Sequence, residues 1–206
     1  MARLARVLIS LAVTAALPGV AAAAPPGTAA PIIVLPSAAS PAAASVPPGC
    51  LPGGNGYLRA RIRGALNLDI DWRNAQLECD GGPRPDGSGI RVSFAGPKRT
   101  DGKRLRMVFG VGAAREGRSG RELPTNLTVI VEGGKRLYTT GGDAHCTVDA
   151  LRQQRLRDPA RKARVYRIVA RGFCVAPAST LNQAEHILVS SFDFAGSAVF
   201  GDDAVR

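Results

Sequence analysis

Residues 56–72, GYLRARIRGALNLDIDW, alternate apolar and polar side chains along their whole length. The even positions from Leu58 to Trp72 are apolar or glycine, while the odd positions change from arginines to asparagine and aspartates. This period of two is typical of a strand with one buried face. A bend at residues 63–65 predicts a hairpin in which paired residue numbers sum to 128. A single long bent strand is the alternative.

In this register, basic side chains of the first strand face acidic or amide side chains of the second. The expected pairs are Tyr57 with Asp71, Arg59 with Asp69, Arg61 with Asn67, Leu58 with Ile70, Ala60 with Leu68, and Ile62 with Leu66. A slip by one residue would expose the whole apolar row, so that row sets the register. The carboxylates Asp69 and Asp71 could also bind a cation or act as acid and base. A charged, solvent-facing strand surface is the favoured interpretation, because no third ligand adjoins them.

Similar patterns recur along the rest of the chain and predict further strands. Residues 89–96 and 103–111 alternate in the same way, and 164–173 and 186–200 continue the pattern. In residues 125–140, the sequence EGGK supplies the glycines of a tight hairpin turn. Only ASTLNQAEH, residues 178–186, predicts a short helix. We therefore expect an all-β domain, an antiparallel sandwich or barrel-like fold of about nine short strands with at most one short helix.

The N-terminal region predicts export. Residues 1–22 carry two arginines, an apolar run and then small residues, which is the pattern of a cleaved signal peptide. Residues 23–49 are uncharged and rich in Pro, Ala and Ser, which predicts an extended linker. Residues 50–206 remain for the β domain. The expected location is the periplasm or the medium, without a membrane span.

The four cysteines support an oxidising compartment and permit three pairings. If residues 146–154 and 166–174 pair antiparallel with numbers summing to 320, Cys146 lies opposite Cys174. The same register places Asp149 opposite Arg171 and Leu151 opposite Val169. The remaining pair is Cys50 with Cys79. Zinc binding is the alternative, but the chain has no CxxC spacing.

Net charge changes the functional picture. The 27 Lys and Arg residues minus Arg3 and Arg6 of the signal leave 25, against 16 acids, so the net charge falls from +11 to +9. Such a field favours anionic partners such as lipopolysaccharide, teichoic acid, acidic polysaccharide or nucleic acid, although the sequence carries no specific nucleic-acid signal. The loop 155–164 concentrates this charge, and a merely solubilising loop is the alternative. The candidate anion-binding residues in it are Arg155, Arg157, Arg161, Lys162 and Arg164.

Candidate catalytic residues are few. His145 and His186 are the two histidines, and no nucleophile elbow, HExxH helix or phosphate loop accompanies them. The loop 80–89 carries Asp80 and Asp86 but lacks the acidic spacing of calcium loops, so a plain surface loop is favoured. We predict no metal and no cofactor. A carboxylate-dependent hydrolase remains an alternative, and its candidate acids are Asp69, Asp71, Glu78 and Asp193.

Three functional hypotheses follow from these patterns. The first is an exported, non-enzymatic β-sandwich that binds an anionic envelope component or another exported protein. The second is a small polysaccharide hydrolase that uses paired carboxylates. The third is an inhibitor or accessory subunit that presents a loop to a secreted enzyme. Clustering of the candidate acids in one cleft would favour the hydrolase, whereas a sheet flanked by basic loops would favour binding.

Overall fold

The computed structural model describes residues 49–157 and 162–201, which form a single antiparallel sheet of eleven strands. The strands are β1 (Tyr57–Gly64), β2 (Leu68–Arg73), β3 (Glu78–Pro83), β4 (Gly89–Ala95), β5 (Arg104–Gly112), β6 (Leu123–Glu132), β7 (Leu137–Thr139), β8 (Cys146–Leu156), β9 (Arg164–Cys174), β10 (Ala178–Thr180) and β11 (His186–Phe200). Within this part of the chain, one 3₁₀ turn, η1 (Asn74–Gln76), is the only helical element. The expected all-β antiparallel fold is confirmed. The predicted signal peptide lies outside the described residues, as does the linker up to residue 48.

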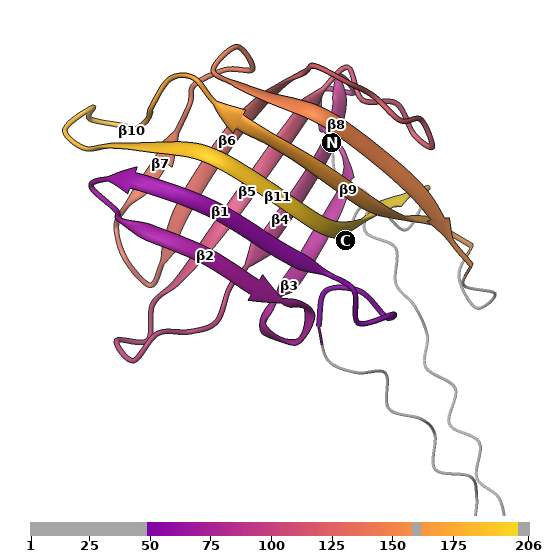
Figure 1. Ribbon diagram of the computed structural model, residues 1–206, viewed down its shortest axis with the longest axis horizontal. Helices are drawn as coiled ribbons and strands as arrows, with labels where there is room; N and C mark the ends of the chain where they lie inside the picture. Colours follow the sequence, from indigo (N-terminus) through magenta and orange to yellow (C-terminus); the bar gives the residue numbers. More distant parts are fainter. Residues whose placement is uncertain (1–48, 158–161, 202–206) are drawn as a thin grey trace, which may run out of the picture. The chain divides into compact units, whose positions relative to one another are not determined.

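The sheet folds over itself into two layers. Its main path runs β2-β1-β11-β10-β7-β6-β5-β4-β3, while β9 pairs with β11 and β8, and β8 also pairs with β6. Figure 1 shows β2, β1, β11, β9 and β8 side by side in one layer, which crosses over β4, β5 and β6 in the other. β11 is thus flanked by β1 along one edge and by β9 along the other.

Aromatic side chains fill the space between the layers. Phe194 is fully buried, and its ring centroid lies 5.0 Å from that of Phe94 and 4.7 Å from that of Phe109. Phe192 also packs on Phe109, at 4.8 Å. Because alternate residues of a strand point to opposite faces, burial of Phe192 and Phe194 places Asp193 on the outer face of β11.

β3 approaches the C-terminal half of β11 so closely that it needs a glycine. A Cβ on Gly81 would lie 2.3 Å from the carbonyl oxygen of Ser197. No side chain fits at that distance, so Gly81 permits the two layers to meet at this end.

The β1–β2 hairpin is confirmed, but its predicted register is wrong by two residues. The observed pairs sum to 130, so Arg59 lies opposite Asp71 and Arg61 lies opposite Asp69. Five residues, 63–67, separate the last pair, Ile62 with Leu68, where three were expected. Asn67 closes this loop by donating from Nδ2 to the carbonyl oxygen of Gly64 at 3.1 Å. Gly64 has φ +114°, a conformation that other residues rarely adopt. A shift by two residues leaves every side chain on its predicted face.

The β8–β9 hairpin follows the predicted register only as far as Val148. Cys146 lies opposite Cys174 as expected, but the register shifts between Val148 and Ala150. The predicted pairs Asp149–Arg171 and Leu151–Val169 are therefore wrong, because Ala150 faces Arg171 and Leu151 faces Ala170. Val148 and Leu151 are both buried although they are three residues apart. A period of two cannot bury both, so a bulge at Asp149 inserts the extra residue.

The predicted helix at 178–186 is wrong. Residues 178–180 form β10, and the following turn is held by local side-chain hydrogen bonds. The Thr180 hydroxyl donates to Asn182 Oδ1 at 2.7 Å and accepts from the Glu185 amide at 3.2 Å. Such local bonds compete with the helical pattern of backbone bonding. The turn returns the chain directly into β11, and with the other short strands this raises the expected nine strands to eleven.

Both predicted disulfides are present, Cys50–Cys79 and Cys146–Cys174, and no cysteine is free. The predicted hairpin at EGGK is also confirmed, because β6 and β7 pair across it. Among the described residues, no helix is long and apolar enough to span a bilayer.

Candidate functional site

Arginines on most of the domain have acidic partners. Nine arginines that lie outside residues 113–122, 146–157 and 162–174 each have a carboxylate oxygen within 4.0 Å. They are Arg59, Arg61, Arg63, Arg73, Arg84, Arg91, Arg104, Arg106 and Arg136. Arg99 is the exception among the described arginines of these regions.

The opposite holds for residues 113–122, 146–157 and 162–174, which we call the basic region. The last two ranges are β8 and β9 with the described residues that adjoin them. There, Arg164 forms an ion pair with Glu116. The arginines of this region with no carboxylate oxygen within 4.0 Å among the described residues are Arg115, Arg118, Arg121, Arg152, Arg155, Arg157, Arg167 and Arg171. Arginines without carboxylate partners are therefore concentrated on one part of the surface.

Three of these side chains line one groove, the arginine groove. It has a volume of about 660 Å³ and lies over the outer face of β8 and β9. Arg121, Arg152 and Arg171 line it and are all exposed. Ser119 and Gly120 form one side, Val169 contributes an apolar surface, and Asp193 stands on β11. The groove thus combines three cations, an apolar surface and one carboxylate.

Backbone and side-chain hydrogen bonds hold residues 113–122 against β8. Gly120 and Leu151 exchange backbone hydrogen bonds of 3.0 and 2.9 Å. Gln153 accepts from the Gly117 amide at 3.0 Å and donates to the carbonyl oxygens of Arg115 and Arg118, both at 2.8 Å. These bonds therefore fix the chain immediately before Arg121.

A second attachment joins this segment to the start of β9. Arg164 donates to both carboxylate oxygens of Glu116, at 2.6 and 3.1 Å. The hydrogen bond from Arg164 holds the pKa of the Glu116 carboxyl below its usual value. Glu116 thus remains ionised at neutral pH, and the attachment persists there.

Two features leave Arg171 without an acid. The bulge moves Asp149 out of the position opposite Arg171 and places Ala150 there. On the other side Asp193 is opposite Arg171, but its carboxylate is engaged by β1. It accepts from the Tyr57 hydroxyl at 2.8 Å and lies 3.6 Å from Arg59 Nη1. β-Bulges often occur at functional sites, where they redirect side chains.

Tyr57 fixes the orientation of Asp193. Burial, together with the hydrogen bond to Asp193, raises the pKa of the Tyr57 hydroxyl. The hydroxyl therefore stays protonated at neutral pH and keeps donating to the carboxylate. Arg59 stacks over the Tyr57 ring, 4.9 Å from its centroid, and stabilises the same arrangement.

The candidate residues of loop 155–164 lie elsewhere on the same hairpin. Arg155, Arg157 and Lys162 are exposed, and Arg164 is bound to Glu116. Arg161 lies outside the described residues. None of the four described candidates lines the arginine groove. Anion binding by this loop stays a prediction, separate from the groove that the structure forms.

The candidate acids of the hydrolase hypothesis do not form one cluster. Glu78 contacts Arg104 at 2.8 Å, while Asp69 contacts Arg63 at 2.9 Å. Asp69 and Asp193 do line a second, smaller groove of about 240 Å³, together with Arg59 and Arg61. Both carboxylates there contact arginines, whereas a general acid for glycoside cleavage needs an environment that favours its neutral form.

The histidines provide one contact that the sequence patterns did not predict. His186 Nδ1 lies 2.8 Å from Ser179 Oγ, and both residues are at the start of the β10–β11 pair. No described carboxylate bonds to the His186 ring. A Ser–His contact without a third group to orient the ring lacks the arrangement of a nucleophilic site. His145 is exposed beside the Cys146–Cys174 disulfide.

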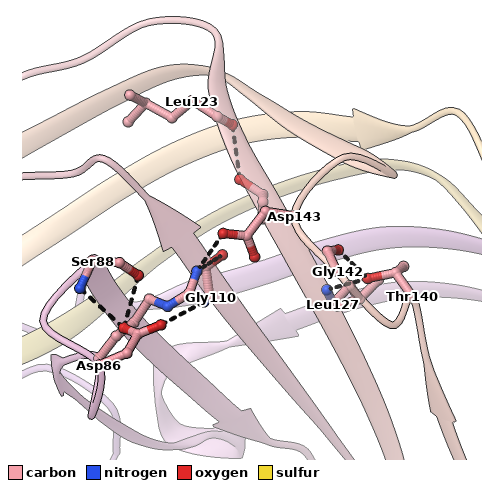
Figure 2. A network of polar contacts seen from close by, with 10 residues as sticks. Asp86, Ser88, Gly110, Leu123, Leu127, Thr140, Gly142 and Asp143 are labelled. Carbon is pink, nitrogen blue, oxygen red and sulfur yellow. Dashed lines mark hydrogen bonds and ion pairs between the residues drawn. The ribbon is translucent and has the colours of Figure 1, made fainter.

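The loop 80–89 is held by arginine rather than arranged around a cation. Asp86 accepts from the amide and hydroxyl of Ser88, at 3.0 and 2.7 Å. Figure 2 shows Asp86 and Asp143 in the same polar network, which Arg84 joins by contacts of 3.2 and 2.8 Å. Across residues 49–157 and 162–201, no three His, Cys, Asp or Glu side chains are placed to hold a metal ion.

Comparison with known proteins adds nothing to this geometry: no family model matches the chain, and neither a curated protein nor a solved structure is significantly similar to it.

Proposed function

We propose that this protein is an exported, non-enzymatic binding domain that holds an anionic component of the cell envelope or its surroundings in the arginine groove. The observation that carries the proposal is the convergence of Arg121, Arg152 and Arg171 on one groove without an acidic partner among the described residues. Outside the basic region, every described arginine except Arg99 has one.

The chemistry of the guanidinium group favours such a ligand. Arginine presents a planar fork of N–H donors that matches carboxylate, phosphate and sulfate groups. Neighbouring guanidinium groups repel one another, and a bound anion relieves that repulsion. The net positive charge of the chain also attracts anions over a longer range.

Export is supported by two independent features. Both disulfides of the domain are formed, which is typical of oxidising compartments. The first 22 residues also have the charge, apolar run and small residues of a signal peptide. Together they support a location where polysaccharides and other anionic polymers are the available partners.

The proposal is tested by measuring the affinity of the purified protein for heparin, a sulfated polysaccharide, by isothermal titration calorimetry at low and physiological salt. Affinity should fall with salt, because binding releases counterions. The triple variant Arg121→Gln, Arg152→Gln, Arg171→Gln should bind at least about tenfold more weakly, with an unchanged melting temperature.

A matched control removes the same charge from another surface. Lys98, Arg99 and Lys135 are exposed, and none has a carboxylate partner among the described residues. Replacing all three by Gln should leave the affinity within about twofold. Equal losses in the two triple variants would mean that heparin senses only net charge, and the groove would be rejected as the site.

A third variant separates the groove from the loop that the sequence favours. Replacing Arg157, Arg161 and Lys162 by Ser removes charge from loop 155–164 without changing a residue of the groove. We expect a smaller loss than for the groove variant. Loss of binding in the loop variant together with full binding in the groove variant would overturn the proposal and place the site in the loop.

A further inference from the structure

The arginine groove is not uniformly basic, and this limits the chemistry of its ligand. Among its lining residues, Asp193 is the one carboxylate, held in place by the Tyr57 hydroxyl at 2.8 Å. A ligand made only of anionic groups would bring negative charge against Asp193. A ligand that also carries hydrogen-bond donors would use the carboxylate as an acceptor.

The surface between the arginines and Asp193 is apolar. Val169 is partly exposed on the outer face, opposite Arg152 on β8 and Ala195 on β11. Arg171 is two residues further along β9, so Arg152 and Arg171 are diagonal cross-strand neighbours. Such neighbours have Cα atoms about 7–8 Å apart. Their guanidinium groups therefore reach one acidic substituent, or two adjacent ones, beside Val169.

The size of the groove agrees with a small ring system. Its volume of about 660 Å³ falls within the range of about 300–1,000 Å³ for sites that bind small organic ligands. The open face toward solvent admits a chain that continues beyond the groove.

We propose that the ligand of the arginine groove is an acidic saccharide, a sugar whose carboxylate or sulfate group is bound by Arg152 and Arg171, with Arg121 beside them. In this arrangement a sugar hydroxyl donates to Asp193, and the C–H face of the ring packs on Val169. This proposal rests on the proposed function and specifies its ligand: a polyphosphate lacks the hydroxyl donors, and a neutral sugar lacks the anion.

The test compares three probes by isothermal titration calorimetry on the purified protein at physiological salt. They are trigalacturonate, inorganic tripolyphosphate and neutral maltotriose. Tripolyphosphate has the higher charge density, so electrostatic attraction alone favours it. We expect trigalacturonate to bind at least about tenfold more tightly than either of the others.

A substitution at Asp193 sharpens the test. In Asp193→Asn the side-chain oxygen still accepts from Tyr57, but the charged acceptor for a sugar hydroxyl is lost. The preference for trigalacturonate over tripolyphosphate should fall by about tenfold, because hydrogen bonds to charged groups are the stronger ones. Asp71→Asn is the matched control, since Asp71 also pairs with Arg59 but lies outside the groove. It should leave the preference unchanged.

The outcomes distinguish the two proposals. If tripolyphosphate binds as tightly as trigalacturonate and Arg171→Gln weakens both, the saccharide is wrong while anion binding in the groove stands. If maltotriose binds as tightly as trigalacturonate, both proposals are overturned. If no probe binds, the saccharide proposal is overturned, and the heparin measurement decides the proposed function separately. If Asp193→Asn lowers the melting temperature markedly, the preference of wild-type protein among the three probes still decides the question.

Discussion

The β1–β2 and β8–β9 hairpins flank β11 on its two edges (Figure 1). Both present arginines on the outer face. In β1–β2, the register places Asp71 opposite Arg59 and Asp69 opposite Arg61. In β8–β9, a bulge removes Asp149 from the position opposite Arg171. The arginines of β1–β2 therefore have acidic partners within their own hairpin, whereas Arg171 has none and is available for a ligand.

The difference has little energetic consequence for the fold. Exposed ion pairs contribute about 0–1 kcal/mol each, so leaving arginines without partners destabilises the domain only slightly. Arginine positions on this surface are thus free to serve binding. The comparison teaches that the number of arginines does not distinguish the two hairpins, whereas the absence of acidic partners does, and the proposed anion site rests on that difference.

The largest expected effect is on the stability of the fold, and it can be measured separately from the effect on binding in the groove. Replacing Cys146 and Cys174 by Ala opens a disulfide that spans 28 residues, which should lower the free energy of unfolding by about 3–4 kcal/mol. Because this disulfide joins β8 to β9, heparin affinity should fall as well. Urea denaturation and calorimetry measure the two effects.

The Cys50–Cys79 disulfide is the control for that experiment. It spans 29 residues, so its replacement by Ala should destabilise the domain by a similar amount. It joins the chain before β1 to β3, away from the groove, and heparin affinity should be retained under conditions where circular dichroism shows a folded protein. Equal losses of affinity in both variants would contradict a role for β8–β9 geometry.

The difference between the two hairpins can be removed directly by giving Arg171 an acidic partner. Ala150→Asp places a carboxylate opposite Arg171, as Asp69 is opposite Arg61. We expect heparin affinity to fall by about tenfold or more, while stability changes by less than about 1 kcal/mol. Ala150→Asn has the same size without the charge and should bind nearly as well as wild type. Similar losses in both would indicate steric blockage instead.

The reverse experiment removes the acids of β1–β2. Asp69→Asn with Asp71→Asn leaves Arg61 and Arg63 without their carboxylates. Stability should fall by less than about 1 kcal/mol, because both acids are mostly exposed. Heparin affinity should rise by no more than about twofold, because the groove beside these residues is much smaller. A second heparin site of equal affinity would show that unpaired arginines suffice without the larger groove.

The smallest effect concerns pH. The pKa of Glu116 is lower in the folded protein than its usual value of 4.5, so its pairing with Arg164 is present above that value and is lost as pH falls through the lower folded-state pKa. We therefore expect a small loss of heparin affinity only below about pH 4.5. Glu116→Gln should lack this component. Identical pH profiles of the two proteins would exclude Glu116 as a positioning residue.

Local patterns in the sequence were enough to predict much of the fold. Alternation predicted β4, β5, β9 and β11, and EGGK predicted the β6–β7 turn, because periodicity and turn chemistry act over a few residues. The cysteine pairs followed from strand pairing near Cys146 and Cys174. Local pattern failed at residues 178–186, where Thr180 and Asn182 bond to the turn instead of allowing a helix.

The arginine groove was not predicted, and none of its three arginines belongs to the loop 155–164 that the sequence singled out. Arg121 lies in the segment before β6. Backbone hydrogen bonds between Gly120 and Leu151 attach this segment to β8, and these two residues are far apart in the chain. The sequence signal for the bulge was the spacing of two apolar residues, Val148 and Leu151, which are three residues apart. That spacing becomes informative only once both are known to be buried.

The sequence by itself determined the all-β class, the face on which each side chain of the main strands lies, and the pairing of the cysteines, because a period of two and a few turn residues suffice for these. Tertiary structure alone decided which arginines have carboxylate partners. A register shift of two residues in β1–β2 leaves every face unchanged, so the apolar pattern cannot detect it, yet it changes every cross-strand partner. The bulge in β8–β9 likewise leaves Leu151 buried while removing Asp149 from Arg171. Hydrophobic burial selects the face, and only the assembled sheet selects the neighbours of each charge.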